Sequence, residues 1–169
     1  MKRRLKGIVA AVLGGLALVI GGLAIYGMTL PREHEVSLTV QVAPPPAEVF
    51  AILVDVEQYT CWRPGVSSVE VRSHDPLRFV TDGEDDTLPF AVVESVPDRK
   101  LVVKIDDESM PWGGAWTYEL APAEAGTTVT ITERGWVDNV VLRGMVNLLM
   151  DPSASIRQFQ ADLLAHKRC

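Results

Sequence analysis

The apolar and polar residues of this chain follow three patterns, one after another. Residues 7–30 contain no charged side chain, residues 35–133 contain short alternating runs separated by turn residues, and residues 139–166 carry apolar side chains at helical spacing. A long apolar run predicts a membrane-spanning helix, alternation predicts strands with one buried face, and a period near 3.6 predicts helices. We therefore expect one membrane helix followed by one α+β domain.

The apolar run predicts a transmembrane helix over residues 7–30. It is longer than the roughly 20 residues that cross the hydrocarbon layer at about 1.5 Å per residue. Cations at positions 2, 3, 4 and 6 precede it, so the positive-inside rule places residues 1–6 in the cytoplasm and the domain of residues 32–169 outside it. The alternative is a cleaved signal peptide, which the length of the run and its poor small-residue cleavage site disfavour. The sequence thus predicts a single-pass protein of the cytoplasmic membrane with an extracytoplasmic domain.

Alternation predicts an antiparallel meander in the domain. Polar residues at 35, 37, 39 and 41 alternate with apolar residues at 36, 38, 40 and 42, and three prolines at 44–46 end this first strand. A short helix over 47–54 and a turn near 56–59 follow, then the loop Trp62-Arg63-Pro64-Gly65. Four or five further strands, six at most, are expected within residues 66–73, 77–81, 88–96, 101–105, 112–120 and 127–133.

The chain is expected to finish as two helical pieces. Apolar residues at 140, 141, 145, 148 and 149 suit one helix, and those at 156, 159 and 163 mark one face of a second, together with His166. Asp151-Pro152 lies between them and has the form of a helix start, with Asp as N-cap and Pro in the first turn. A break or kink is therefore expected there.

Charge and cysteine content narrow the class of protein. Four of the 16 basic residues precede the apolar run, so the rest of the chain carries 12 basic and 22 acidic residues and a formal charge of −10. Such a domain repels phosphate backbones, which argues against nucleic-acid binding. Cys61 and Cys169 would meet an oxidising compartment, but one bridge to a chain terminus is weakly indicated, and we expect unpaired thiols.

Motifs for metal, cofactor or hydrolytic chemistry are absent from the sequence. The histidines at 34, 74 and 166 do not stand at metal-ligand spacing, and the acidic loops 82–86 and 106–108 lack the EF-hand pattern. The chain has neither a Gly-rich phosphate loop nor a G-x-S-x-G nucleophile elbow. The sequence therefore predicts no metal and no cofactor, although scattered acids and bases of a cyclase or dehydratase would not form a motif.

Two segments carry a family resemblance. The segment VAPPPAEVFAILVDVEQYTCWRPGVSSVEV and the segment WTYELAPAEAGTTVTITERG resemble the opening and the last hairpin of the polyketide cyclase/dehydrase and lipid-transport family, SRPBCC. The resemblance covers approximately residues 36–167. It implies a START-like helix-grip fold, in which a curved antiparallel sheet wraps a long C-terminal helix around a cavity for sterols, lipids, polyketides or other apolar molecules.

Strand parity suggests which side chains line such a cavity. Positions 112, 116, 118 and 120 share one face of a strand, and positions 129, 131 and 133 share one face of the next, with Tyr118 and Glu133 as polar groups. The candidate lining residues are Trp62, Arg63, Phe90, Trp112, Trp116, Tyr118, Val129, Ile131, Glu133, Met145 and Leu149. A solid aromatic core without a cavity fits the same pattern equally well. For Arg63, a solvated surface charge is favoured over a partner of Glu133 or a cavity-mouth residue.

Three functions are consistent with these observations. The leading hypothesis is a membrane-tethered binding module for a hydrophobic small molecule or lipid. The second is a polyketide cyclase/dehydratase-like enzyme with Glu133, Tyr118 or Arg63 as acid-base groups. The third is a cell-envelope interaction module without a small ligand, whose protein partner the sequence does not identify.

Overall fold

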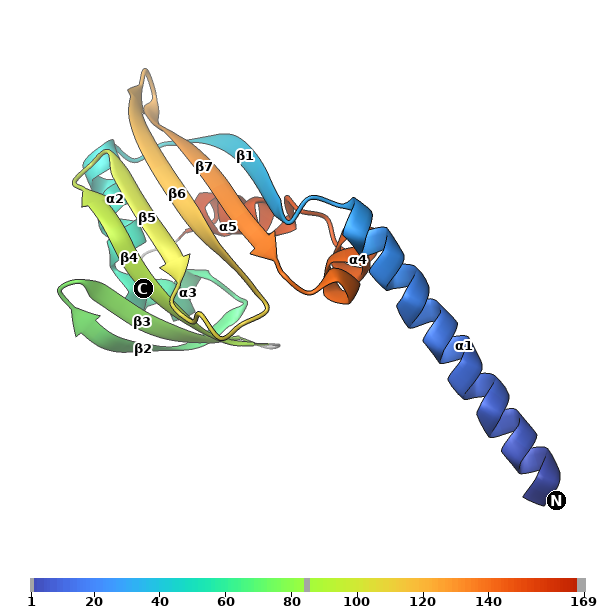
Figure 1. Ribbon diagram of the computed structural model, residues 1–169. Helices are drawn as coiled ribbons and strands as arrows, with labels where there is room; N and C mark the ends of the chain where they lie inside the picture. The colour runs from blue at the N-terminus through green and yellow to red at the C-terminus, as the bar shows by residue number, and fades with distance from the viewer. Residues whose placement is uncertain (1, 84–85, 167–169) are drawn as a thin grey trace.

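The computed structural model describes residues 2–83 and 86–166, and Figure 1 shows a curved sheet with helices at the end of a long projecting helix. The helices are α1 Lys2–Thr29, α2 Pro46–Val54, the 3-10 turn η1 Val56–Gln58, α3 Tyr59–Trp62, α4 Val140–Leu149 and α5 Ala154–Leu164. The strands are β1 Glu33–Val42, β2 Val66–His74, β3 Leu77–Gly83, β4 Thr87–Val96, β5 Lys100–Ile105, β6 Trp112–Ala123 and β7 Gly126–Val137.

The strands form one antiparallel sheet in the order β1-β7-β6-β5-β4-β3-β2. All six segments named from alternation are strands, which is the maximum expected and one or two more than the four or five favoured, and the last one continues to Val137 because Gly135 and Trp136 stay paired with β1. The first strand returns to pair with the last, so Val36 lies opposite Glu133. This pairing joins the beginning and the end of the domain side by side.

The core lies between the concave face of the sheet and helices α2 and α5. Val129 and Ile131 of β7 are fully buried, as are Val49 of α2 and Ile156 of α5. Burying each such side chain contributes about 1.5–3 kcal/mol relative to leaving it exposed. The arrangement is the START-like helix-grip fold that the resemblance implies.

The C-terminal segment forms two separate helices, α4 and α5, and not one long helix inside the sheet. The expected break is present between Leu149 and Ala154, but α5 begins two residues after Pro152, and Asp151 instead accepts hydrogen bonds from Ser153 before the helix. Helix α5 packs on both β1 and β7, whereas α4 packs mainly on α1. The element inside the grip is therefore shorter than expected.

The state of Cys61 corrects one expectation. Cys61 takes part in a disulfide and is not a free thiol, contrary to the unpaired state that the sequence favoured. Cys169 lies outside the described residues. A structural disulfide is typical of proteins of oxidising compartments.

Candidate functional site

A circuit of aromatic rings lines the inside of the grip. Consecutive ring centroids lie 5.1–6.1 Å apart in the order Trp116, Phe90, Phe79, Tyr59, Trp62, Phe159 and Tyr118. The rings come from β3, β4, β6, α3 and α5, and most of the contacts are edge-to-face, which is a favoured geometry for aromatic pairs. Because Trp116 and Tyr118 are two apart on β6, the circuit almost closes on itself.

Glu133 of β7 places a carboxylate at the edge of this aromatic wall. The Trp116 Nε1–H donates to Glu133 Oε2 at 2.9 Å, and the Ser155 hydroxyl of α5 donates to the same oxygen. The other oxygen, Oε1, is 3.6 Å from His34 Nε2 of β1. The side chain is only 13% exposed, so donors from neighbouring elements replace the water that a carboxylate normally binds.

Two glycines make room beside this carboxylate. Gly135 of β7 pairs with Gly114 of β6, so the inner face has no side chain at either position. A Cβ on Gly135 would stand 2.3 Å from His34 Cε1, which is closer than any real contact. The imidazole of His34 thus occupies the space above Gly135 and is held next to Glu133 by sterics.

Arg63 lies inside the grip as well. Its guanidinium carbon is 5.1 Å from the ring centroid of Tyr59 and 4.9 Å from that of Phe159, a cation–π geometry. Its Nε is buried and has no hydrogen-bond acceptor among the described residues. The expectation of a solvated surface charge is therefore wrong for Arg63, and one donor of the guanidinium remains available.

Two tyrosines in the grip stay protonated over the physiological range. Burial raises the pKa of Tyr59 to about 12, with Arg63 opposing the shift, and its hydroxyl donates to the Leu53 carbonyl oxygen at 2.7 Å. Burial raises the pKa of Tyr118 further; Tyr59 and Glu133 act in the same direction and Arg63 opposes them. The Tyr118 phenol can therefore donate a hydrogen bond but is a poor general base.

The structure brings most of the sequence-derived candidates together. Trp62, Arg63, Phe90, Trp116, Tyr118, Val129, Ile131 and Glu133 lie in or directly behind the aromatic lining, and half-buried Trp112 begins β6 beyond the two glycines. Met145 and Leu149 do not line the grip: they belong to α4, which packs on α1, and their side chains are exposed. Placing them in the lining was wrong.

Other members of the site were missed. His34, Tyr59, Phe79, Ser155 and Phe159 complete the lining and the contacts of Glu133. His34 has the same strand parity as Val36, which could have identified it once β1 was paired with β7.

Two hollows lie away from Glu133, and one of them borders the aromatic lining at Trp62. One, of about 400 Å³, is bordered by α2, Trp62 and His166, and the other, of about 500 Å³, lies between α2 and the β2–β3 turn. Neither includes Trp116, Tyr118 or Glu133. Inside the grip the aromatic rings pack against one another.

Comparisons with known proteins agree with this architecture. A model of the family described as "Polyketide cyclase / dehydrase and lipid transport" matches residues 33–157, well over half of the chain. No curated protein shows significant sequence similarity.

Solved structures show the same fold at low sequence identity. The di-domain ARO/CYC StfQ from the steffimycin biosynthetic pathway superposes with a TM-score of 0.64 at 15% identity over 79% of this chain, which spans half the length of that protein. A START superfamily protein from Mycobacterium smegmatis gives 0.58 at 15% identity, covering 78% of this chain and 95% of the other. Norcoclaurine synthase from Thalictrum flavum gives 0.63 at 8% identity, covering 83% and 89%.

Proposed function

This chain belongs to the polyketide cyclase / dehydrase and lipid transport family, and we propose that it is a membrane-tethered member that holds a hydrophobic small molecule or lipid in its helix grip. The observation that carries the proposal is the placement of the Glu133 carboxylate at the edge of a nearly closed aromatic wall. Burying a carboxylate until only 13% of it is exposed costs free energy, which a purely structural core would avoid. A binding site, in contrast, needs a few polar groups in an apolar lining.

The polar groups indicate the chemistry of the ligand. Arg63 Nε is a buried donor without an acceptor among the described residues, which favours a carbonyl or carboxylate oxygen on the ligand. Glu133 Oε1 faces His34 and can accept from a ligand hydroxyl or amine. The aromatic rings suit an apolar, ring-containing or acyl body between these ends. Because Ser155 closes over Glu133, the first turn of α5 must shift when such a molecule enters.

Helix α1 supports the tethering. Within the described part of the chain, Lys6–Thr29 is the one helical stretch long and apolar enough to cross a membrane. Three residues join α1 to β1, and at about 3.5 Å each they keep the grip within roughly 10–15 Å of the bilayer. The N-terminal cations and the disulfide at Cys61 both favour an extracytoplasmic domain. A ligand that partitions into the membrane is thereby kept at high local concentration.

The proposal is tested by comparing the small molecules that copurify with two forms of the full chain. Wild type and Glu133→Leu are purified from the native host in the same detergent, and bound molecules are identified by native mass spectrometry and solvent extraction. Lipid around α1 is the same in both proteins, so a molecule carried only by the wild type belongs to the grip. Identical extracts from the two proteins would contradict binding at Glu133, and Glu70→Leu on the exposed face of β2 serves as the matched control.

Catalysis is the second candidate function. It is favoured by the 3.6 Å approach of His34 Nε2 to Glu133 Oε1, which brings two titratable side chains together at the edge of the aromatic wall. Once a ligand is identified, Glu133→Gln separates the two functions, because a carrier retains its ligand unchanged while an enzyme retains affinity and loses turnover. Empty extracts together with capture of a protein partner would instead support an interaction module.

A further inference from the structure

Helix α4 is packed against the end of α1 with almost no space between the two backbones. A Cβ on Gly27 of α1 would stand 1.8 Å from the Val140 carbonyl oxygen, and a Cβ on Gly144 of α4 would stand 2.5 Å from the Leu23 carbonyl oxygen. Glycine at both positions therefore permits backbone contact, as is typical of helix pairs in membranes. The contact covers the last two turns of the apolar stretch Lys6–Thr29.

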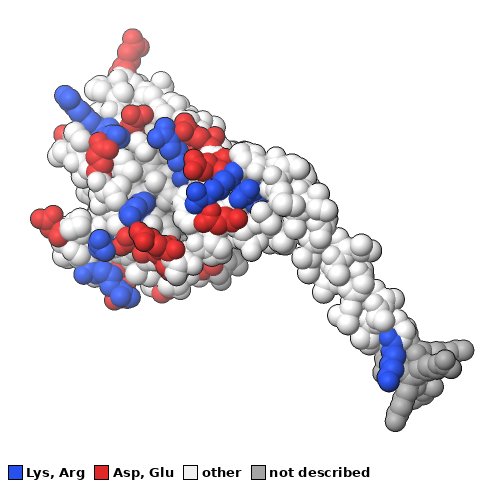
Figure 2. Space-filling view, viewed as in Figure 1, with Lys and Arg blue, Asp and Glu red and all other residues white. Residues whose placement is uncertain are grey.

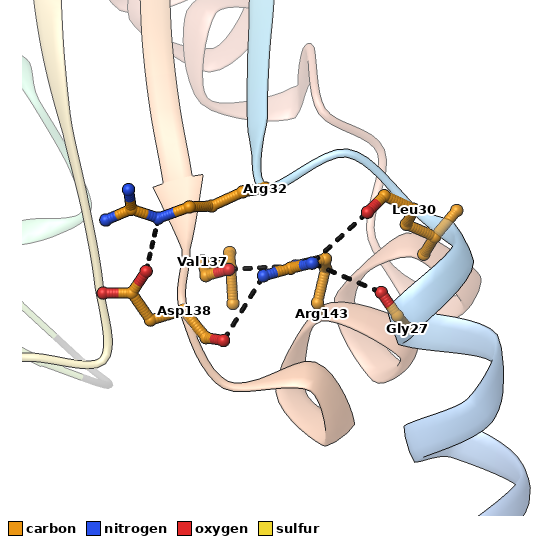
Figure 3. A network of polar contacts seen from close by, with 6 residues as sticks. All are labelled: Gly27, Leu30, Arg32, Val137, Asp138 and Arg143. Atoms are coloured by element: carbon orange, nitrogen blue, oxygen red, sulfur yellow. Dashed lines mark hydrogen bonds and ion pairs between the residues drawn. The ribbon is translucent and has the colours of Figure 1, made fainter.

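The polar side chains Arg143 and Asn147 of α4 form hydrogen bonds with the end of α1. Figure 3 shows the Arg143 guanidinium between the end of α1 and the turn after β7, where it donates to the carbonyl oxygens of Gly27 at 3.4 Å, Leu30 at 3.2 Å and Val137 at 2.9 Å. The bond to Leu30 satisfies a carbonyl that the end of α1 leaves open, and the bond to Val137 ties α4 to the end of β7. The Tyr26 hydroxyl donates to Asn147 Oδ1 at 2.7 Å. Arg143 is the only charged residue of α4, so no charge remains for its outer face.

That outer face is apolar and exposed. The exposed fractions are 42% for Met145, 60% for Leu148, 77% for Leu149 and 63% for Met150, which follows the helix. In water such a cluster would be a liability, and in a protein of this size it marks an interaction surface. An amphipathic helix with a continuous apolar face is typical of elements that lie in a membrane interface.

The neighbouring surface of α1 identifies what covers this face. Ile25 and Met28 of α1, both 64% exposed, lie in the same two turns that α4 contacts. Helix α4 runs antiparallel to α1, because its residue 140 lies against Gly27 and its residue 144 lies against Leu23. Its later residues Leu148 and Leu149 are therefore directed toward the middle of the apolar stretch. Figure 2 shows charged side chains gathered over the sheet domain, while the surface where α1 joins the domain is uncharged in this view.

We propose that α4 is a membrane-inserted helix, whose side chains at 145, 148, 149 and 150 lie among the acyl chains of the leaflet next to the domain. The inference rests on the proposed function in one respect, that α1 spans the membrane. The inserted α4 would be a second attachment of the domain to the membrane, beside α1. Two attachments fix the orientation of the grip relative to the bilayer, whereas one only keeps it nearby. Because residues 150–155 lead from α4 directly to Ser155 at Glu133, the same attachment brings the lipid phase to the edge of the site.

The test measures the surroundings of single spin labels on the full chain in vesicles of phosphatidylcholine and phosphatidylglycerol. A keto amino acid introduced at one position carries the label, so that thiols are left untouched. The positions are Leu149, with Leu18 of α1 as the lipid reference and Val93 of β4 as the water reference, which are 80% and 54% exposed. Access to oxygen and to a water-soluble nickel complex is then compared.

The proposal predicts that the label at Leu149 resembles the one at Leu18. Its ratio of oxygen to nickel accessibility should exceed the ratio at Val93 by about tenfold, because hydrocarbon excludes the polar complex. A label at Leu149 that resembles Val93 while Leu18 stays in lipid would overturn the insertion of α4 and leave the tether intact. A label shielded from both reagents would show that protein covers α4, which also overturns it. Water access at Leu18 would instead refute the membrane-spanning role of α1.

Discussion

Gly144 of α4 lies directly against Leu23 of α1, so that a Cβ added to Gly144 would stand 2.5 Å from the Leu23 carbonyl oxygen. The contact joins the apolar helix to the C-terminal part of the domain, 121 positions further along the chain. Helix α4, whose Met145 and Leu149 were expected to line the cavity, packs mainly on α1 instead. The domain and α1 consequently pack together through α4.

Gly144→Ala should separate the two helices. The new methyl group meets backbone, which cannot rotate away, and overpacking of this kind costs about 1–3 kcal/mol of unfolding free energy. Gly22→Ala is the control, because a Cβ there meets nothing within 4 Å and alanine favours the helix by up to about 1 kcal/mol. Heat-induced unfolding of both full-length variants in the same detergent provides the measurement. Equal melting temperatures for the two variants would contradict the close packing.

Arg143→Met should loosen the joint between α1 and β1. The variant keeps an apolar stem but removes the Arg143 donor from the carbonyl oxygens of Leu30 and Val137, at a cost of about 2–3 kcal/mol. The Gly27 oxygen keeps its bond from the Leu30 N–H. Hydrogen–deuterium exchange should become faster at residues 30–33 and 140–144. Arg72→Met removes an exposed ion pair with Glu70 on β2 and should cost less than about 1 kcal/mol. Unchanged exchange at the joint would mean that Arg143 is dispensable.

The sheet could be predicted from the sequence because each strand has one buried face. In the first strand the apolar residues at 36, 38, 40 and 42 face inward and the polar residues between them face outward. The same period located the six later strands to within a few residues. Turn residues such as Gly126, which takes a φ of 115°, marked the ends. These signals are local, so a single sequence contains them.

Parts of the site could not be predicted because they depend on which segments meet. The apolar face of α4 was evident, but periodicity does not say whether a sheet, a helix or a bilayer covers it, so Met145 and Leu149 were assigned to the cavity. Arg63 follows a short helix in a Pro-Gly loop, a pattern typical of the surface, and its burial depends on Phe159 nearly a hundred residues away. His34 reaches Glu133 only through the pairing of β1 with β7.

Stability should fall at alkaline pH through Tyr59. Its pKa is about 12 in the folded protein and about 10 in the unfolded chain, so the folded state holds the proton more tightly. The corresponding stability, roughly 3 kcal/mol, is fully present below pH 10 and is lost as the pH rises toward 12. Tyr59→Phe should therefore be less stable than wild type at pH 8, because it lacks the bond to Leu53, and the difference should shrink by pH 11. A constant difference across this range would show that Tyr59 does not titrate as stated.

Gly135→Ala should weaken ligand binding although it replaces none of the polar residues of the site. The added methyl group would displace the His34 ring, which lies 2.3 Å from its position, and so disturb the 3.6 Å approach to Glu133. We expect about tenfold lower affinity, equivalent to about 1.4 kcal/mol, measured as ligand occupancy of the purified full chain. Gly65→Ala, where a Cβ meets nothing within 4 Å, should retain wild-type occupancy. If both variants keep the ligand, His34 has no part in the site.

Under the proposed function, an apolar molecule sits inside the grip of the membrane-tethered protein. The most direct test replaces Phe159, which lies 5.1 Å from Tyr118 and 5.5 Å from Trp62 between ring centroids, with a photoreactive benzoylphenylalanine in the full chain. Cells of the native host are irradiated, and the labelled peptide is analysed by mass spectrometry, with the same substitution at exposed Val93 as the reference. We expect a reproducible small-molecule adduct at position 159 and none at position 93. Adducts at neither position, or at both alike, would contradict it.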